Sequence, residues 1–430
     1  MSPELDLVVR GGTVVDATGT RTADVGVRQG LVVAVAAGLD AGPRVSTLDA
    51  GGCVVAPGLV DLHAHLRQPG MEEAETVESG ARAAALGGYT AVVAMPNTDP
   101  PIDCAAVVRE VLDLGALAPC DVRVAGAISK GRRGEELAPL AEMAALGVRL
   151  FTDDGRGVQD SRLMRRAMEY GSVLGVTLAQ HCEDAALAGG GHMHEGEWSS
   201  LLGVAGVPAE AEELMLARDV ALARLTGCPV HFLHVSTAGS VALVAAAKGQ
   251  GLAVTAEVTP HHLTLTDAVV ASYDPVFKVN PPLRAQADVD ALRGGVANGT
   301  LDAVATDHAP HPQEAKEAPF DEAPPGMLGL ETALAVLLTE LELPMERLLA
   351  LMSWEPARIA GIADVHGGRL AQGRPANLCV IDPGATWVVE PAALASRSRN
   401  TPFAGRRLRG RVRHTILAGD PVVVDGEAQR

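Results

Sequence analysis

The sequence is poor in aromatic side chains, in positive charge and in long apolar runs. Only 3% of its 430 residues are Phe, Trp or Tyr, so Ala, Val, Leu and Gly must do most of the core packing. Acidic residues outnumber basic residues by 53 to 35, and the formal charge of −18 argues against nucleic acid or an anionic membrane as the main partner. No uninterrupted apolar stretch reaches the ~18–20 residues that a membrane span requires. These absences predict a globular protein with a large core.

The sequence also has no closely spaced cysteine pair, and its first residues do not predict a signal peptide. The six cysteines are scattered without a Cys-x-x-Cys pair, which predicts buried free thiols in a reducing compartment. The first residues, 1–6, lack the basic and apolar regions of a signal peptide. We therefore expect a cytoplasmic protein. The one basic stretch, Arg397–Arg413, is interpreted as a solvated edge or loop in preference to a binding patch.

Both ends of the chain consist of short β-type runs separated by turns. Leu7–Arg10 and Asp24–Arg28 are examples in residues 1–56, and Val412–Leu417 is one in residues 362–430. The shared texture predicts one small β-sandwich domain built from both termini. Two independent β-appendages are the alternative.

The middle of the chain, residues 57–361, alternates apolar runs with Ala- and Leu-rich helical patterns. This alternation predicts βα units around a parallel sheet, and eight of them indicate a TIM (β/α)8 barrel. A doubly wound sheet is the competing architecture, but no Gly-x-Gly-x-x-Gly follows the first run. The eight expected strands are Val54–His65, Thr90–Met95, Val122–Ile128, Val148–Thr152, Val176–His181, Val230–Val235, Ala253–Val258 and Ala303–Thr306.

A His-x-His pair ends the first of these runs. Residues two apart in a strand face the same side, so His63 and His65 should project together, with Arg67 two residues further on. Two imidazoles on one face suit a metal ion such as Zn²⁺, although an isolated pair could equally be two ordinary histidines. The other runs end in polar or metal-competent side chains too, and function in a barrel lies at these strand ends. The hypothesis is a metal centre at this end of the barrel.

Seven motifs in this sequence resemble those of bacterial dihydroorotases. These enzymes belong to the amidohydrolase superfamily, and the type in question has an Asp instead of a carboxylated Lys at the metal bridge. The motifs are Asp61-Leu-His-Ala-His-Leu-Arg-Gln-Pro-Gly70, Met95-Pro-Asn-Thr98, Phe151-Thr-Asp-Asp-Gly155, His181-Cys-Glu-Asp184, His234-Val-Ser-Thr237, Lys278-Val-Asn-Pro-Pro-Leu-Arg284 and Ala305-Thr-Asp-His-Ala-Pro-His311.

The resemblance implies a role for each matching residue. The implied ligands of one or two zinc ions are His63, His65, Asp154, His181, His234 and Asp307, with Asp153 as the competing register for Asp154. Asp307 is also the implied catalytic proton carrier. The implied substrate-binding residues are Arg67, Asn97 and His311 for the substrate carboxylate, and Asn280, Pro325 and Gly326 for the ring.

The implied activity is zinc-dependent interconversion of N-carbamoyl-L-aspartate and L-dihydroorotate in pyrimidine biosynthesis, with a metal-activated hydroxide attacking the ring amide. Allantoinases and dihydropyrimidinases are near alternatives, but their usual bridge is a carboxylated Lys and they lack the Arg of His-Leu-Arg. A metal-free scaffold for aspartate carbamoyltransferase is another alternative, but such relatives lose metal ligands. An active homo-oligomer that also docks aspartate carbamoyltransferase is compatible with the sequence.

Several features lie outside this constellation. His231 lies three residues before His234 and should face the other way along a strand, and by the same parity at most one of His261 and His262 should face the barrel mouth. The second His-x-His pair, His192 and His194, is not expected to form a metal site. The segment His311–Met327, rich in Pro and Gly, is expected to be a lid that closes over bound ligand.

Overall fold

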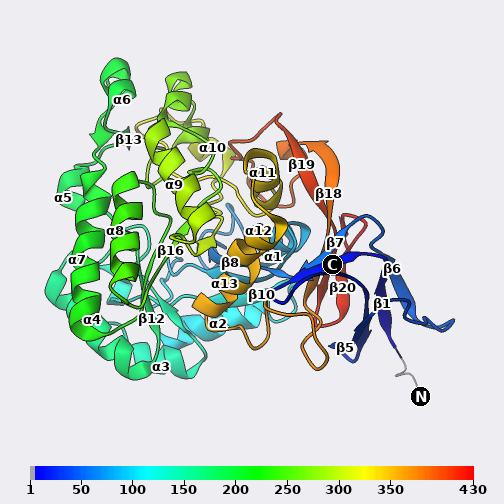
Figure 1. Ribbon diagram of the computed structural model, residues 1–430. Coiled ribbons are helices and arrows are strands. Elements are labelled where there is room, and N and C mark those ends of the chain that lie inside the picture. The colour runs from blue at the N-terminus through cyan, green and yellow to red at the C-terminus, as the bar shows by residue number, and fades with distance from the viewer. Residues whose placement is uncertain (1–4) are drawn as a thin grey trace.

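The computed structural model describes residues 5–430, and one part of it is a β-sandwich (Figure 1). Blue N-terminal strands and red C-terminal strands lie together in it, and β18 pairs antiparallel with β7. One sheet has the order β5-β4-β1-β6, and the other has the order β21-β20-β19-β18-β7-β2-β3. The bounds are β1 Leu7–Arg10, β2 Thr13–Asp16, β3 Gly19–Thr22, β4 Asp24–Arg28, β5 Leu31–Ala36, β6 Ser46–Asp49, β7 Val54–Pro57, β18 Leu378–Val388, β19 Arg407–Leu417, β20 Asp420–Val424 and β21 Glu427–Ala428.

Apolar side chains of both sheets meet in the core of the sandwich. Val9 and Val25 come from the first sheet, and Val55, Val380 and Ile416 come from the second. All five are at most 1% exposed. One domain built from both termini is therefore confirmed, and the alternative of two separate appendages is wrong.

The second part is a closed barrel of parallel strands. A three-stranded sheet, β10-β9-β8, and a five-stranded sheet, β11-β12-β15-β16-β17, supply its wall. Bridges between Gly126 and Phe151 and between Ala64 and His308 join the two sheets at both edges. The strand bounds are β8 Leu59–Ala64, β9 Tyr89–Ala94, β10 Asp121–Val124, β11 Leu150–Phe151, β12 Thr177–Gln180, β15 Val230–Phe232, β16 Val254–Val258 and β17 Ala303–Val304.

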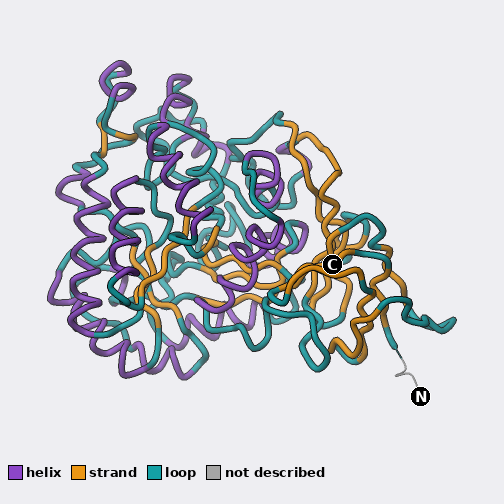
Figure 2. Tube along the Cα trace, viewed as in Figure 1, coloured by secondary structure: helices purple, strands orange, loops and turns teal. Residues whose placement is uncertain are grey.

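Helices surround this barrel, as the purple segments outside the orange strands show (Figure 2). Local chemistry starts and stops them: Thr76 and Ser79 form a capping box on α1, and Gly175 ends α4 in the left-handed conformation. The helices are α1 Val77–Leu86, α2 Ala105–Gly115, α3 Leu140–Ala145, α4 Ser161–Leu174, α5 Ala185–Ala188, α6 Glu197–Leu202, α7 Glu210–Thr226, α8 Ala238–Gly249, α9 Gln286–Asn298, α10 Gln313–Lys316, α11 Ala333–Glu340, α12 Met345–Leu349 and α13 Glu355–Ile359. A small ribbon of β13 Met193–His194 and β14 Gly206–Val207 projects beside α6.

The expected single strand Val54–His65 is wrong, because two strands of different sheets occupy it. β7 joins the sandwich and β8 joins the barrel, with Gly58 between them. A Cβ at Gly58 would lie 2.2 Å from side-chain atoms of Thr90, so the chain can pass the barrel wall there only without a side chain. The division of the chain at 56/57 and 361/362 stays a prediction.

The basic stretch Arg397–Arg413 forms local contacts instead of a continuous patch. Arg406 pairs with Glu340, Arg413 with Asp49 and Asp425, and the Arg411 guanidinium lies 5.9 Å from the Trp387 ring centre. Within residues 5–430, no helix is long and apolar enough to cross a membrane. All six cysteines are free thiols.

Candidate active site

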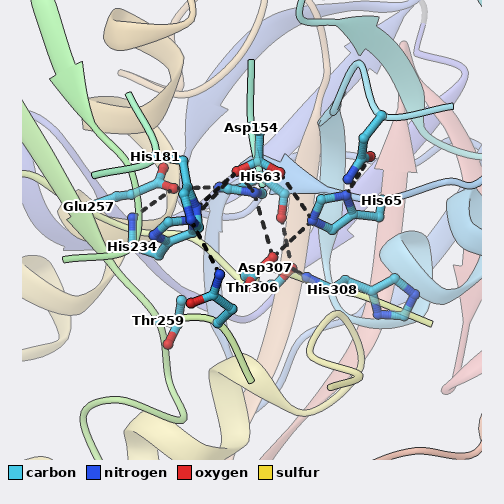
Figure 3. A network of polar contacts seen from close by, with 12 residues as sticks. His63, His65, Asp154, His181, His234, Glu257, Thr259, Thr306, Asp307 and His308 are labelled. Atoms are coloured by element: carbon cyan, nitrogen blue, oxygen red, sulfur yellow. Dashed lines mark hydrogen bonds and ion pairs between the residues drawn. The ribbon is translucent and has the colours of Figure 1, made fainter. Parts of the chain in front are cut away.

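Six side chains from the carboxyl ends of five barrel strands converge at one end of the barrel (Figure 3). His63 lies in β8, and the other five follow the last residues of their strands. Parallel strands bring their carboxyl ends to one rim, so residues far apart in sequence become neighbours there. The six are His63, His65, Asp154, His181, His234 and Asp307, and each is at most 5% exposed.

The ligand atoms of these residues form two overlapping groups. His63, His65 and Asp307 make one group and His63, Asp154 and His234 the other, with all atoms of a group within 4.8 Å of one another. His63 Nε2 lies 3.4 Å from Asp154 Oδ1 and 3.5 Å from Asp307 Oδ1. His181 lies outside both groups, but its Nδ1 is 3.0 Å from His234 Nε2 and 3.7 Å from Asp154 Oδ1.

Two atoms in the middle of this cluster are buried without a hydrogen-bond partner in the described chain, namely His63 Nε2 and Asp154 Oδ1. Burial lowers the pKa of His63, but the carboxylates of Asp154 and Asp307 outweigh it and raise that pKa well above its usual value. The cluster therefore has an excess of lone pairs and negative charge that a cation would satisfy. Imidazole nitrogens with carboxylate oxygens are a donor set suited to Zn²⁺.

Neighbouring side chains set which nitrogen each first-strand histidine offers. His63 Nδ1 donates to Glu257 Oε1 over 2.8 Å, and His65 Nδ1 donates to Asn97 Oδ1 over 2.8 Å. Both rings thus turn Nε2 toward the two aspartates, and this is the nitrogen that each ring would offer to a bound metal ion. Burial is the main cause that lowers the pKa of His65, which keeps its ring neutral.

Glu257 contacts the candidate ligand His63, and the sequence interpretation missed it. Its other oxygen, Oε2, lies 3.0 Å from His231 Nε2. Burial raises the pKa of Glu257, but the hydrogen bonds from His231 and His63 outweigh it and bring that pKa to about 2. The available signal was an acidic residue inside the apolar strand β16, where an unpaired charge would be costly.

The structure separates Asp153 from Asp154. Asp153 turns away from the cluster, where its Oδ1 accepts from the backbone N–H groups of Ile128 and Ser129 at 2.9 and 3.0 Å. Asp154 points among the histidines, and Arg132 donates to its backbone carbonyl. Of the two adjacent carboxylates, only Asp154 can reach a metal held by His63 and His234.

Three residues of the site have backbone angles that glycine usually adopts. Arg67, His234 and Asp307 have φ values of 61°, 30° and 46°. Such strain costs about 1–3 kcal/mol per residue and is found where surrounding contacts enforce it. The expectation that strand alternation places Arg67 is wrong, because β8 ends at Ala64 and a left-handed turn aims this side chain.

A cavity of about 170 Å³ lies beside the cluster. Arg67 lines it and is 8% exposed, and its Nε donates to Pro310 O over 3.1 Å. No carboxylate of residues 5–430 forms an ion pair with Arg67, and burial lowers its pKa to about 10. The cavity thus holds a guanidinium without an anion, and this group has the charge and the planar donor geometry that suit a carboxylate or phosphate.

The other expected substrate-binding residues line the same cavity, which is bordered by Asn97, Asn280, His311, Pro325 and Gly326. His311 Nε2 donates to Pro325 O over 2.9 Å and lies 3.4 Å from Arg67 Nη2. Burial, helped by the charge of Arg67, lowers the pKa of His311 to about 3, so its ring is neutral at physiological pH. Closure of the segment His311–Met327 as a lid stays a prediction; the structure places α10 within it.

The remaining histidines make local contacts. His231 packs in the wall with Thr255 and Glu257. His261 and His262 are both buried in a turn after β16, so the parity argument does not apply to them. His194 faces Arg284 over 3.2 Å.

Known proteins resemble the chain over its whole length. A family described as Dihydro-orotase-like matches residues 52–240. A dihydroorotase of Pelotomaculum thermopropionicum is 47% identical over 98% of this chain and 99% of its own, and one of Streptomyces coelicolor is 49% identical over 98% and 95%.

Solved structures also match. An L-hydantoinase (dihydropyrimidinase) from Arthrobacter aurescens superposes with a TM-score of 0.89 and 26% identity, covering 99% of this chain and 98% of that one. The TIM barrel with an appended β-sandwich is thus an amidohydrolase architecture. With nearly half of all residues identical over the full length, the chain belongs to the dihydroorotase family.

Proposed function

We propose that this protein is a zinc-dependent dihydroorotase that interconverts N-carbamoyl-L-aspartate and L-dihydroorotate in pyrimidine biosynthesis. The observation that carries the proposal is Arg67, a buried guanidinium without a protein anion, in the cavity that also borders the aspartate–histidine cluster. A cyclic amide with a ring carboxylate suits both halves of this cavity. Family membership supports the assignment to cyclic-amide hydrolysis.

The proposed zinc ligands are the residues of the cluster. The ligands are His63, His65, Asp154, His181, His234 and Asp307. Bound zinc would supply a water whose pKa is near 7, available as a nucleophile at physiological pH.

Asp307 is the proposed proton carrier. Its Oδ1 lies 3.0 Å from His65 Nε2 and its side chain borders the cavity. Burial raises its pKa, but the charge of His63 and the contact with the His65 ring outweigh it, so Asp307 is ionised at neutral pH and can accept a proton. In hydrolysis it would take the proton of the attacking water and deliver it to the ring nitrogen as the amide C–N bond breaks. Cyclisation runs the same transfers backwards.

Arg67, Asn97 and His311 are proposed to hold the ring carboxylate. Asn97 uses its carbonyl for His65, so its amide N–H groups remain for the substrate. The ring Nε2–H of His311 donates to the Pro325 carbonyl and would exchange that acceptor for the substrate carboxylate. Asn280, whose Nδ2 lies 3.4 Å from His181 Nε2, would face the ring together with Pro325 and Gly326.

Hydantoin or dihydropyrimidine hydrolysis is the second candidate, favoured by the structural similarity to the Arthrobacter L-hydantoinase. Neutral rings leave Arg67 buried without a partner, which disfavours them. The test compares hydrolysis of dihydroorotate, dihydrouracil and hydantoin by enzyme with zinc, after chelation and after zinc is restored. We expect activity on dihydroorotate alone, lost on chelation and recovered with zinc. Full activity in metal-free enzyme would contradict the proposal.

We also propose a cytoplasmic homo-oligomer. Large apolar side chains are exposed on outer helices α4, α6 and α7, among them Val173 (83%), Leu201 (68%) and Leu225 (61%). Light scattering of the purified protein tests the oligomer. Docking to aspartate carbamoyltransferase is proposed only from the behaviour of some family members, and co-purification with that enzyme tests it.

A further inference from the structure

A short segment between β18 and β19, residues 395–400, leaves the β-sandwich and enters the mouth of the barrel. It is bonded first to the loop that follows β8. The Arg397 N–H donates to Glu75 Oε1 over 3.1 Å, and Ser398 Oγ donates to Ala74 O over 2.8 Å. That loop also carries Arg67, so the segment lies against one of the two loops that form the carboxylate receptor.

Asn400, at the end of this segment, is bonded to the other loop, the one that follows β17. Its Oδ1 accepts from the backbone N–H of His311 at 3.2 Å, and its Nδ2 donates to Ala309 O at 3.0 Å and to Gly326 O at 3.1 Å. Its backbone carbonyl accepts from Leu328 N at 3.1 Å. The residue is 5% exposed, so these bonds are shielded from water.

These bonds hold both ends of the segment His311–Met327 at once. Ala309 and His311 lie at its beginning, and Gly326 and Leu328 lie at its end. The two ends are also packed tightly, since a Cβ at Gly326 would lie 2.8 Å from Ala309 Cβ and 2.9 Å from His311 Nε2. The position of His311 in the cavity therefore depends on contacts that Asn400 completes.

Arg67 depends on the same loop. Its Nε donates to Pro310 O, and Pro310 lies between the two residues that Asn400 holds at this end. Asn400 itself does not line the cavity or approach the metal cluster. Its influence on a bound carboxylate must pass through Pro310, His311 and Gly326.

We infer that Asn400 is a positioning residue for substrate recognition. Through Asn400, the β-sandwich holds the loop that presents His311 to the substrate carboxylate and that supplies the Pro310 carbonyl to which Arg67 is bonded. The inference rests on the proposed function, because it names the carboxylate as the group positioned. It gives the β-sandwich a part in substrate affinity. The metal centre is built without it.

Asn377 provides a matched control. It is also a buried asparagine next to the sandwich strands, 7% exposed, with its Nδ2 donating to Val365 O over 2.9 Å and its Oδ1 accepting from Ala418 N at 2.7 Å. It is not among the residues that line the active-site cavity. Asn377→Ala therefore reports what loss of a buried asparagine does to general stability.

The kinetic test compares Asn400→Ala and Asn377→Ala with wild type, with zinc content measured in each. We expect Asn400→Ala to raise KM for dihydroorotate about tenfold, equal to about 1.4 kcal/mol, with kcat within about threefold and full zinc content. Asn377→Ala should leave KM unchanged. In a His311→Ala background the effect of Asn400→Ala on KM should be smaller than in wild type, because the part that acts through His311 is lost and only the part that acts through Pro310 and Arg67 remains. An unchanged KM, or an equal effect in both backgrounds, would overturn the inference.

Hydrogen exchange of the substrate-free proteins tests the clamp without any activity. Amides of residues 309–328 should exchange at least about tenfold faster in Asn400→Ala than in wild type or Asn377→Ala. Equal exchange in all three would overturn the inference even if KM had risen. A wild type inactive on dihydroorotate would overturn the proposed function instead, and faster exchange in Asn400→Ala would still support the clamp.

Discussion

The two sides of the active-site cavity are built in different ways. On the side of the cavity with the candidate metal ligands (the metal side), each of these six residues lies at or just beyond the end of a barrel strand, and the barrel wall positions it. On the carboxylate side, Arg67 and His311 lie on loops beyond the strands. Residues 395–400 hold both loops: the Arg397 N–H donates to Glu75 on the first loop, and Asn400 bonds to the second. Asn400 comes from the segment between two strands of the other domain.

This difference suggests that chemistry and specificity have separate supports. A barrel strand is held by its neighbours over its whole length, so its end is a rigid place for a ligand. A loop needs additional hydrogen bonds for the same rigidity, and changing those bonds alters substrate fit while the metal centre stays intact. The predictions below test whether the two sides can be damaged independently.

The largest effect is expected on the metal side, at Asp307. Asp307→Asn removes the carboxylate that we propose accepts and returns the proton, and general acid–base catalysis contributes about 10²–10⁴-fold. We expect kcat for dihydroorotate to fall by that factor, with KM changed little. Steady-state kinetics with zinc analysis of the same sample measures it. Near-normal turnover would assign the proton carrier to another residue.

The carboxylate side should give the next largest effect, at Arg67. A charged hydrogen bond is worth about 1.5–3 kcal/mol, and every ~1.4 kcal/mol is tenfold, so Arg67→Ala should lower kcat/KM for dihydroorotate about ten- to a few-hundred-fold. Zinc content should stay at the wild-type level. Arg67→Lys should recover part of the loss, since it keeps the charge but not the planar fork. If wild type had the same kcat/KM for hydantoin as for dihydroorotate, Arg67 would not be the residue that selects a ring with a carboxylate.

Glu257 tests the support of the metal side. Residues that orient a metal-binding histidine are worth about 10–100-fold in metal affinity, so Glu257→Gln should weaken zinc binding by that factor. Titration against a competing chelator measures the affinity. Glu331→Gln is the control. Glu331 accepts from the Ala395 N–H and not from a candidate metal ligand, so this change should leave zinc affinity unchanged. Unchanged zinc affinity in Glu257→Gln would mean that the His63 ring is oriented by the barrel wall alone.

The smallest effect concerns Glu331, which accepts from the Ala395 N–H over 2.8 Å at the start of the segment 395–400. Burial raises its pKa from 4.5 to about 7. A raised pKa stabilises the folded state below pH 4.5, and this contribution is lost as the pH rises to 7. Glu331→Gln keeps the acceptor without the ionisation, so it should stabilise the protein at pH 8 by on the order of 1–2 kcal/mol and have little effect at pH 4.5. Thermal melts of wild type and Glu331→Gln at both pH values measure this difference. Equal shifts of Tm at pH 4.5 and pH 8 would contradict a raised pKa for Glu331.

The sequence by itself determined the barrel, the β-sandwich and the candidate ligands. Strand and helix patterns depend on neighbouring residues, so their spacing is visible in one dimension. The pair His63 and His65 and the Thr-Asp-His run around Asp307 are likewise contiguous, and each marks a strand end. Local sequence patterns could therefore predict the part of the site that lies at the strand ends.

Only the tertiary structure decided how that site is supported. Glu257 lies 194 residues from His63, and Asn400 lies 89 residues from His311, so no periodicity links either pair. The choice between Asp153 and Asp154 needed the positions of Ser129 and His63, and the aim of Arg67 needed a left-handed backbone angle. Hydrogen bonds between distant segments form only when folding brings their donors and acceptors within about 3 Å, and a linear sequence carries no record of that distance.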